Sequence, residues 1–208
     1  MPTYPLTFPT VGIVASTFKL VRAVSTSTSP FTFNQQVYRF GGERWEGSVT
    51  FRPMRRTDAG GIQAFLAELR GQYGTFLYGD PDALALGKLG AGGGTPLVKG
   101  ASQTGNTLII DGATAAVSNW LMKGDYFSLG TGTDTRLYML VANVNTNSLG
   151  EATLTFEPAL RASPADNAAV TITSPRGTFR LAESVAQWSS NYASIYDMSL
   201  SFVEAISE

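Results

Sequence analysis

Alternation of apolar and polar side chains is the feature that most restricts the fold of this chain. Within residues 43–52, Trp45, Val49 and Phe51 share one face, and the polar side chains share the opposite face. Successive side chains of a strand point to opposite faces of a sheet, so a period of two predicts a β-strand. The same pattern recurs in residues 178–181 and 194–204. The chain is therefore predicted to be mainly β.

Earlier runs of β-branched and aromatic residues predict further strands at residues 11–15, 19–25 and 31–40, with turns of Ser, Thr and Pro between them. Aromatic residues gather in the third run and just after it: Phe31, Phe33, Tyr38, Phe40 and Trp45. Packing in a core is the favoured interpretation, because a strand with one buried face carries its large apolar residues there. Stacking on sugars or bases is the alternative. The same core interpretation is given to Trp120, Trp188 and Tyr192.

One segment departs from the strand period and predicts a single amphipathic helix at residues 62–70. Its apolar residues recur at helical spacing: Ile62, Phe65, Leu66 and Leu69. Thr57 or Asp58 can cap the free N–H groups at its start, and Gly71 can take the left-handed turn at its end. We expect this helix to pack on a sheet.

A change in composition predicts two domains. Residues 83–97 are rich in Ala and Gly, and the tract at residues 90–94 is typical of a flexible linker. Short strands with Gly, Asn and Asp turns then follow up to residue 173, which predicts a small barrel or sandwich. After Pro175 the first pattern returns. We expect one β-domain from residues 1–85 plus 175–208, with residues 86–174 inserted as a second β-domain.

The residue types that are missing limit the chemistry. The chain contains no cysteine and no histidine, so disulfides, thiolate nucleophiles and Ser-His-Asp catalysis are excluded. A transition-metal site is disfavoured as well, because histidine is the commonest ligand. The sequence therefore predicts a protein that is not an enzyme and that uses no cofactor and no metal.

The charge balance argues against two classes of partner. The formal net charge is -1 and charged residues make up only 15% of the chain. A nucleic-acid binder needs a basic excess or stripe, so no specific nucleic-acid binding is expected. The N-terminus lacks the pattern of a signal peptide, and no apolar run approaches the roughly 20 residues that span a bilayer. We expect no membrane insertion.

Two weaker patterns are better explained by structure than by a binding or catalytic function. The glycines of residues 90–94 are similar to a phosphate-binding loop, but Pro96 follows where a helix should open. Asp80 and Asp125 are acidic turn residues, and a pair of carboxylates could in principle support glycoside hydrolysis. Aspartates favour turns by bonding to their own backbone, and that interpretation is preferred for both.

Four segments carry a resemblance to a known family. They read WEGSVTFRPM at residues 45–54, IQAFLAELRGQYGTFLYGDP at 62–81, KGDYFSL at 123–129 and LTFEPALRASP at 154–164. These segments resemble tail proteins of long-tailed, siphovirus-type bacteriophages, above all the distal tail protein. The resemblance covers most of the chain from Trp45 to Phe202, and its motifs are structural. Residues 1–10 match no motif of the family.

The resemblance implies a belt domain, which is a β-sandwich flanked by one α-helix, with a peripheral β-domain outside it. It implies a homohexameric ring in the virion, assembled in the host cytoplasm, that joins the tail tube protein to the hub or baseplate proteins. The helix at residues 62–70 would be the belt helix.

Assembly by edge strands gives the candidate ring contacts, which lie in residues 31–40 and 194–202. The residues expected there are Phe31, Phe33, Tyr38, Tyr196, Met198 and Leu200. A tail tube or tail-completion protein is the first alternative, since a tube subunit would stack into filaments. A carbohydrate-binding module, with the insert as the lectin, is the second, and a glycoside hydrolase is the third.

Overall fold

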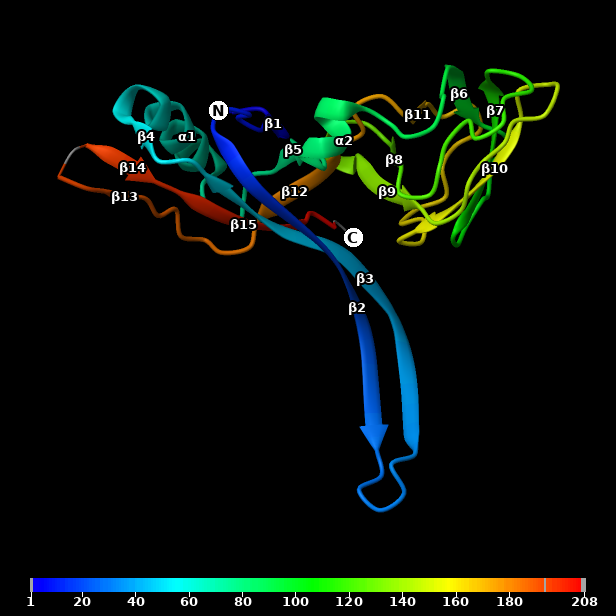
Figure 1. Cartoon of the computed structure of the whole chain (residues 1–208), viewed down its shortest axis with the longest axis horizontal. Helices are drawn as coiled ribbons and strands as arrows, with labels where there is room; N and C mark the ends of the chain where they lie inside the picture. The colour runs from blue at the N-terminus through cyan, green and yellow to red at the C-terminus, as the bar shows by residue number, and fades with distance from the viewer. Residues whose placement is uncertain (1, 193, 207–208) are drawn as a thin grey trace.

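The computed structural model describes residues 2–192 and 194–206 and is mainly β (Figure 1). Its first sheet has the order β1 (Leu6–Thr7), β5 (Phe76–Tyr78), β12 (Gly177–Leu181), β15 (Ser199–Glu204), β3 (Gln35–Phe51), β2 (Ile13–Thr28). The second has the order β11 (Val170–Thr171), β8 (Tyr126–Leu129), β9 (Arg136–Leu140), β10 (Ala152–Glu157), β7 (Thr107–Ala113), β6 (Gly94–Val98). The third joins β13 (Ser189–Ser190), β14 (Ile195–Asp197) and β4 (Met54–Arg55). The helices are α1 (Arg56–Leu69), α2 (Pro81–Leu86) and a 3-10 turn at Gly132–Asp134.

The first core lies between α1 and the first sheet. Trp45, Val49 and Phe51 are buried there, as their alternation predicts. The predicted helix is confirmed, but it begins at Arg56 rather than residue 62 because Ala59 extends its buried face by one turn. Thr57 and Asp58 therefore lie in the first turn and are not the cap, which is Arg55. At the other end, both Arg70 and Gly71 take the left-handed conformation.

The second core fills a nearly closed, barrel-like sheet. Its large buried side chains include Trp120, Phe127, Tyr138 and Phe156. Backbone hydrogen bonds from Val98 to Ala168 and from Asn167 to Val98 join the two ends of the sheet. The closure pairs strand edges that an open sheet would leave free.

The two cores are packed directly against each other. Leu137 of the second sheet is buried in the first core, and its carbonyl accepts a hydrogen bond of 2.9 Å from the Trp45 indole. Arg161, which follows β10, forms an ion pair of 2.7 Å with Glu204 of β15. The division into residues 1–85 plus 175–208 and residues 86–174 remains a prediction, since Leu137 belongs to one segment and packs in the other.

Helix α2 is absent from the sequence-based prediction, which placed only a turn after Tyr78. Pro81 occupies its first turn, and the Asp80 carboxylate accepts a hydrogen bond of 3.0 Å from the Asp82 N–H. An acidic cap followed by proline is a helix-start signal, so this helix was open to prediction. Among the residues of α2, none is buried.

Candidate assembly interface

Strands β2 and β3 run on together beyond the first sheet as a long two-stranded arm (Figure 1). They pair from Ile13 with Phe51 to Thr28 with Gln35. Strand β15 accompanies β3 only as far as Glu46. Beyond that residue, no strand in the described part of the chain covers the outer edge of β3, and β2 is the last strand of its sheet. Both edges of the arm therefore present free backbone groups.

The arm replaces two predicted features. The separate strands expected at residues 11–15 and 19–25 are one continuous strand, β2. The strand expected at residues 31–40 begins only at Gln35, because residues 31–34 form the turn at the tip.

An irregularity marks the base of the arm. Arg22 pairs with Glu43 and Val24 pairs with Arg39, so Ala23 alone opposes the three residues 40–42. Such a bulge bends a ribbon and increases its twist. Gly41 and Gly42 lie in the extra segment, and a Cβ at Gly41 would meet nothing within 4 Å.

A group of charges holds this base against the barrel. Arg22 forms ion pairs of 3.2 Å with Glu43 and 3.0 Å with Glu157 of β10, while the Ala159 N–H donates to Glu43 at 2.8 Å. Burial of Glu43 opposes its ionisation, but the Ala159 N–H and Arg22 outweigh it and lower the pKa of Glu43. The barrel therefore helps to set the direction in which the arm leaves the molecule.

The tip of the arm is a hydrogen-bonded turn that displays two phenylalanines. The Ser29 N–H donates to the Asn34 carbonyl and the Phe33 N–H to the Ser29 carbonyl, each at 2.9 Å. Phe33 takes a positive φ of 56°, a costly conformation for a bulky residue. The Phe31 and Phe33 side chains are 92% and 77% exposed.

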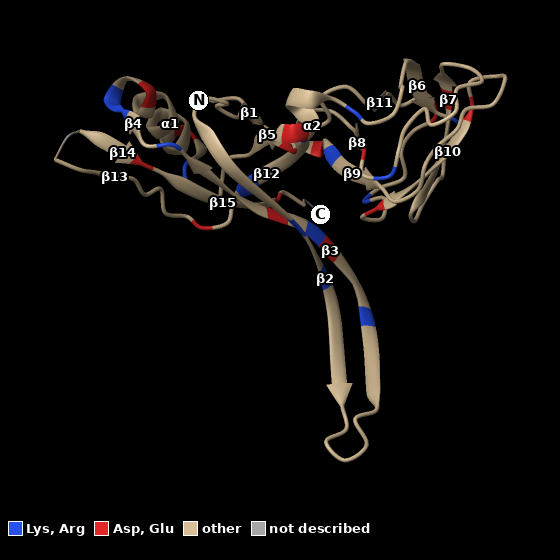
Figure 2. Cartoon of the chain, viewed as in Figure 1, with Lys and Arg blue, Asp and Glu red and all other residues tan. Residues whose placement is uncertain are grey.

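The rest of the arm is exposed and uncharged. From Ala23 to Tyr38 there is no Lys, Arg, Asp or Glu (Figure 2). Val24 and Val37 are exposed on one face, and Tyr38 and Phe40 on the other. Native sheets usually protect a free edge with charges, proline or a covering element. This arm lacks charges over its outer part.

The structure corrects the core interpretation for most of the aromatic residues. Of the first cluster only Trp45 is buried, because Phe31, Phe33, Tyr38 and Phe40 lie past the end of β15, where no other layer of the described residues reaches. Trp120 is buried as predicted, whereas Trp188 and Tyr192 are exposed.

The candidate contact residues separate into two groups. Phe31, Phe33 and Tyr38 are exposed on the arm. Met198 and Leu200 are only 5% and 7% exposed and belong to the first core, which leaves little of either side chain for the predicted ring contact. Tyr196 is half-buried against the same core. The side chains of Met198 and Leu200 both point into the first core, so the apolar face at β15 is used inside the subunit.

The remaining sequence candidates have structural partners. Both carboxylate oxygens of Asp125 accept backbone N–H groups, from Leu89 at 2.5 Å and from Gly90 and Met122 at 3.0 and 2.8 Å. Asp80 caps α2. Burial and the neighbouring Asp80 raise the pKa of Tyr126 to about 12. Asp80 and Asp125 line one shallow cavity of about 180 Å³.

The glycine tract at residues 90–94 is not the flexible linker that was predicted. The Ala91 and Gly92 N–H groups donate to the carbonyls of Asn119 and Trp120. A Cβ at Gly90 would lie 2.5 Å from the Leu121 Cα, so glycine allows this close contact between backbones. These amides are satisfied by the barrel and are not turned toward a phosphate.

Other kinds of site find little support in the geometry. Over residues 2–192 and 194–206, no three acidic side chains group closely enough to hold a metal ion. None of the helices within these residues is long and apolar enough to cross a membrane. No known protein family matches the chain, and no curated protein is significantly similar in sequence.

Proposed function

We propose that this protein is a structural subunit of a phage tail that assembles with copies of itself through the β2–β3 arm. The single observation that carries the proposal is the arm itself, which is long, uncharged over its outer part and uncovered by any layer of the described chain. The assembly is a ring at the distal end of the tail tube, with six subunits as in the family that the sequence resembles.

The physical argument is one of incomplete burial. An isolated two-stranded ribbon is at best marginally stable in water. Here its outer part exposes aromatic and β-branched side chains on both faces. A neighbouring subunit that packs against the arm would bury these side chains and could pair with its free edges.

The rest of the molecule fits such a role. The first sheet with α1 corresponds to the sandwich-like belt with its flanking helix, and the barrel corresponds to the peripheral domain. Because the barrel sheet is nearly closed, the free edges lie mainly in the arm. The tail tube protein and the hub or baseplate proteins are the proposed partners on either side of the ring, and the role requires no catalysis and no cofactor.

The test removes the arm and leaves the body intact. Replacing residues 23–42 with Asn-Gly joins Arg22 to Glu43 through a two-residue hairpin turn. We expect native mass spectrometry and electron microscopy to show single-layer rings for the full chain and monomers for the shortened chain. Thermal unfolding of the two chains should be similar.

Three outcomes would contradict parts of the proposal. Rings formed by the shortened chain would show that the arm does not carry the contact. Long tubes formed by the full chain would favour the tail tube alternative. A full chain that stays monomeric at high concentration and in the presence of its tube and hub proteins would reject the assembly role.

A further inference from the structure

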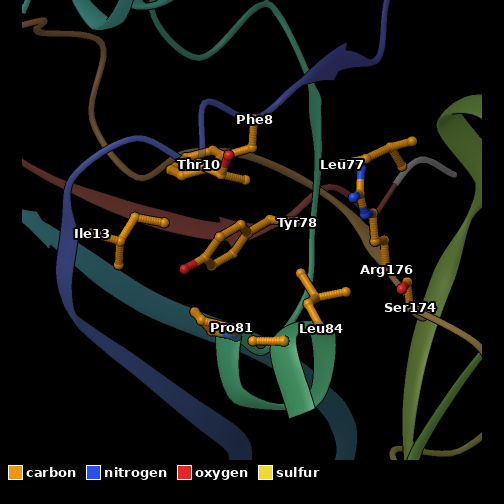
Figure 3. Close-up of a pocket in the computed structure, with 10 residues that line it drawn as sticks. Phe8, Thr10, Ile13, Leu77, Tyr78, Pro81, Leu84, Ser174 and Arg176 are labelled. Atoms are coloured by element: carbon orange, nitrogen blue, oxygen red, sulfur yellow. The ribbon is translucent and has the colours of Figure 1, made fainter. Parts of the chain in front are cut away.

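A second uncovered surface lies on the body, at the place where the chain enters and leaves the barrel. It is a pocket of about 400 Å³ with mainly apolar walls (Figure 3). Four segments meet in it: the stretch before β2, β5, α2 and the return from the barrel. Its main lining residues are Phe8, Ile13, Leu77, Tyr78, Leu84 and Arg176. We call it the α2 pocket.

The residues around the α2 pocket are of the kind found in protein–protein interfaces. Helix α2 forms one wall and has no buried residue, with Leu86 next to the wall strongly exposed. Arg176 is half-buried, and its guanidinium forms no ion pair with any residue that the structure describes. An unpaired guanidinium among apolar walls suits the face of an aromatic ring.

The tip of the arm offers the matching half. Phe31 and Phe33 project from a turn whose hydrogen bonds hold them outward, and no charge accompanies them between Ala23 and Tyr38. The tip lies at the far end of the arm from α2, so it cannot fill the pocket of its own subunit (Figure 1). An arm tip that enters this pocket would therefore belong to another copy.

We propose that Phe31 at the tip of one arm inserts into the α2 pocket of a second copy, with Phe33 packing at its rim. Arg176 would lie against the inserted ring. The tip of the arm and the α2 pocket are different surfaces of the same chain. A contact between them is therefore head-to-tail and can close a ring. This inference rests on the proposed function, for which it supplies the receiving surface of the arm.

Cysteine cross-linking tests the contact directly, because the chain has no cysteine of its own. The exchange Thr32→Cys places a thiol at the tip and keeps both phenylalanines. Ala85→Cys places one at the exposed rim of the pocket. We expect a mixture of the two full-length variants to form a disulfide-linked dimer under mild oxidation. Thr32→Cys mixed with Ser148→Cys, an exposed position on the barrel, should not cross-link.

Two further variants show whether the side chains named here make the contact. Adding Phe31→Ala and Phe33→Ala to the Thr32→Cys chain should abolish the cross-link to Ala85→Cys. Arg176→Gln should weaken assembly about two- to thirtyfold, the range expected for a lost cation–π contact. Arg180→Gln, on strand β12 and not among the pocket residues, should leave assembly unchanged.

Native mass spectrometry of the same samples separates this inference from the proposed function. Rings without the Thr32–Ala85 cross-link would overturn the pocket contact and leave the assembly role standing. No assembly and no cross-link would overturn both. Cross-linked chains that never close would support the pocket contact and reject the ring. Binding of the tip to lipid vesicles, with no cross-link, would overturn the pocket contact and show that the tip binds a membrane.

Discussion

Buried carboxylates hold the places where the arm and the barrel meet the first sheet. Glu43 lies at the base of the arm and accepts both a backbone N–H of the barrel side and the Arg22 guanidinium. Glu204 accepts the Trp45 N–H and pairs with Arg161. Removing one partner of a buried pair leaves a desolvated group, which costs more than the pair contributes.

Glu43→Gln should destabilise the protein by about 1–2 kcal/mol at neutral pH. This is below the usual cost for a buried pair, because Arg22 is partly exposed and water screens it. Since the pKa of Glu43 is lowered on folding, its stabilisation is present above the unfolded pKa near 4.5 and is lost as the pH falls through the lower folded value. Urea unfolding at pH 3–7 should therefore show a smaller acid loss for the variant. Glu46→Gln, in an exposed pair with Arg44, should change stability by less than about 0.5 kcal/mol.

Two glycines give opposite expectations for the same exchange. A Cβ at Gly47 would lie 2.1 Å from the Thr17 carbonyl oxygen and 2.5 Å from the Phe202 ring, whereas Gly60 in α1 has nothing within 4 Å. Gly47→Ala should cost about 3 kcal/mol through overpacking. Gly60→Ala should stabilise by up to about 1 kcal/mol, since alanine favours a helix. Thermal unfolding of both variants checks the pair, and equal shifts would contradict this packing of β2, β3 and β15.

At the scale of elements, the arm is the part of the described chain whose side chains are most exposed. β2 and β3 continue past β15, so the same alternation that buries Trp45 and Val49 near the body exposes Val37 and Tyr38 further out. Burial of a strand is thus decided by how far the neighbouring strands extend.

A charge placed in the arm should prevent assembly without unfolding the subunit. Val37→Lys puts an ammonium group on an exposed position, where charge blocks edge pairing. We expect sedimentation velocity to show at least a tenfold loss of assembly, with an unchanged melting temperature. Ile109→Lys, at an exposed position of β7 in the barrel, is the matched control. Equal effects of the two exchanges would mean that charge alone, wherever it is placed, disrupts the oligomer.

At the scale of the whole molecule, two cores behave as a joined pair. Leu137, the Trp45 indole and the Arg161–Glu204 ion pair connect them, and both chain crossings run beside the α2 pocket. Through this junction, the orientation of the barrel constrains the orientation of the base of the arm.

Arg161→Ala should loosen this junction. It leaves the nearly buried Glu204 carboxylate without its cation, at a cost of about 3 kcal/mol. We expect calorimetry to show one transition for the parent chain and two for the variant, one for each core. Lys99→Ala removes an exposed ion pair with Glu151 inside the barrel and should cost less than about 1 kcal/mol. A single transition at the parent temperature for Arg161→Ala would contradict the coupling.

The local structure can be inferred from the order of the amino acids. A period of two predicted a mainly β chain, and it placed Trp45, Val49 and Phe51 on one buried face. The spacing from Ile62 to Leu69 predicted α1. These patterns can be read locally because the directions of side chains follow from the backbone period alone.

Which apolar faces are covered depends on long-range packing that the local pattern does not contain. Met198 and Phe31 both follow strand-like patterns, yet one is buried under α1 and the other projects from the tip of the arm. The outcome depends on which distant strands arrive beside them and where those strands end. The α2 pocket also depends on tertiary packing, because four segments far apart in the sequence form it.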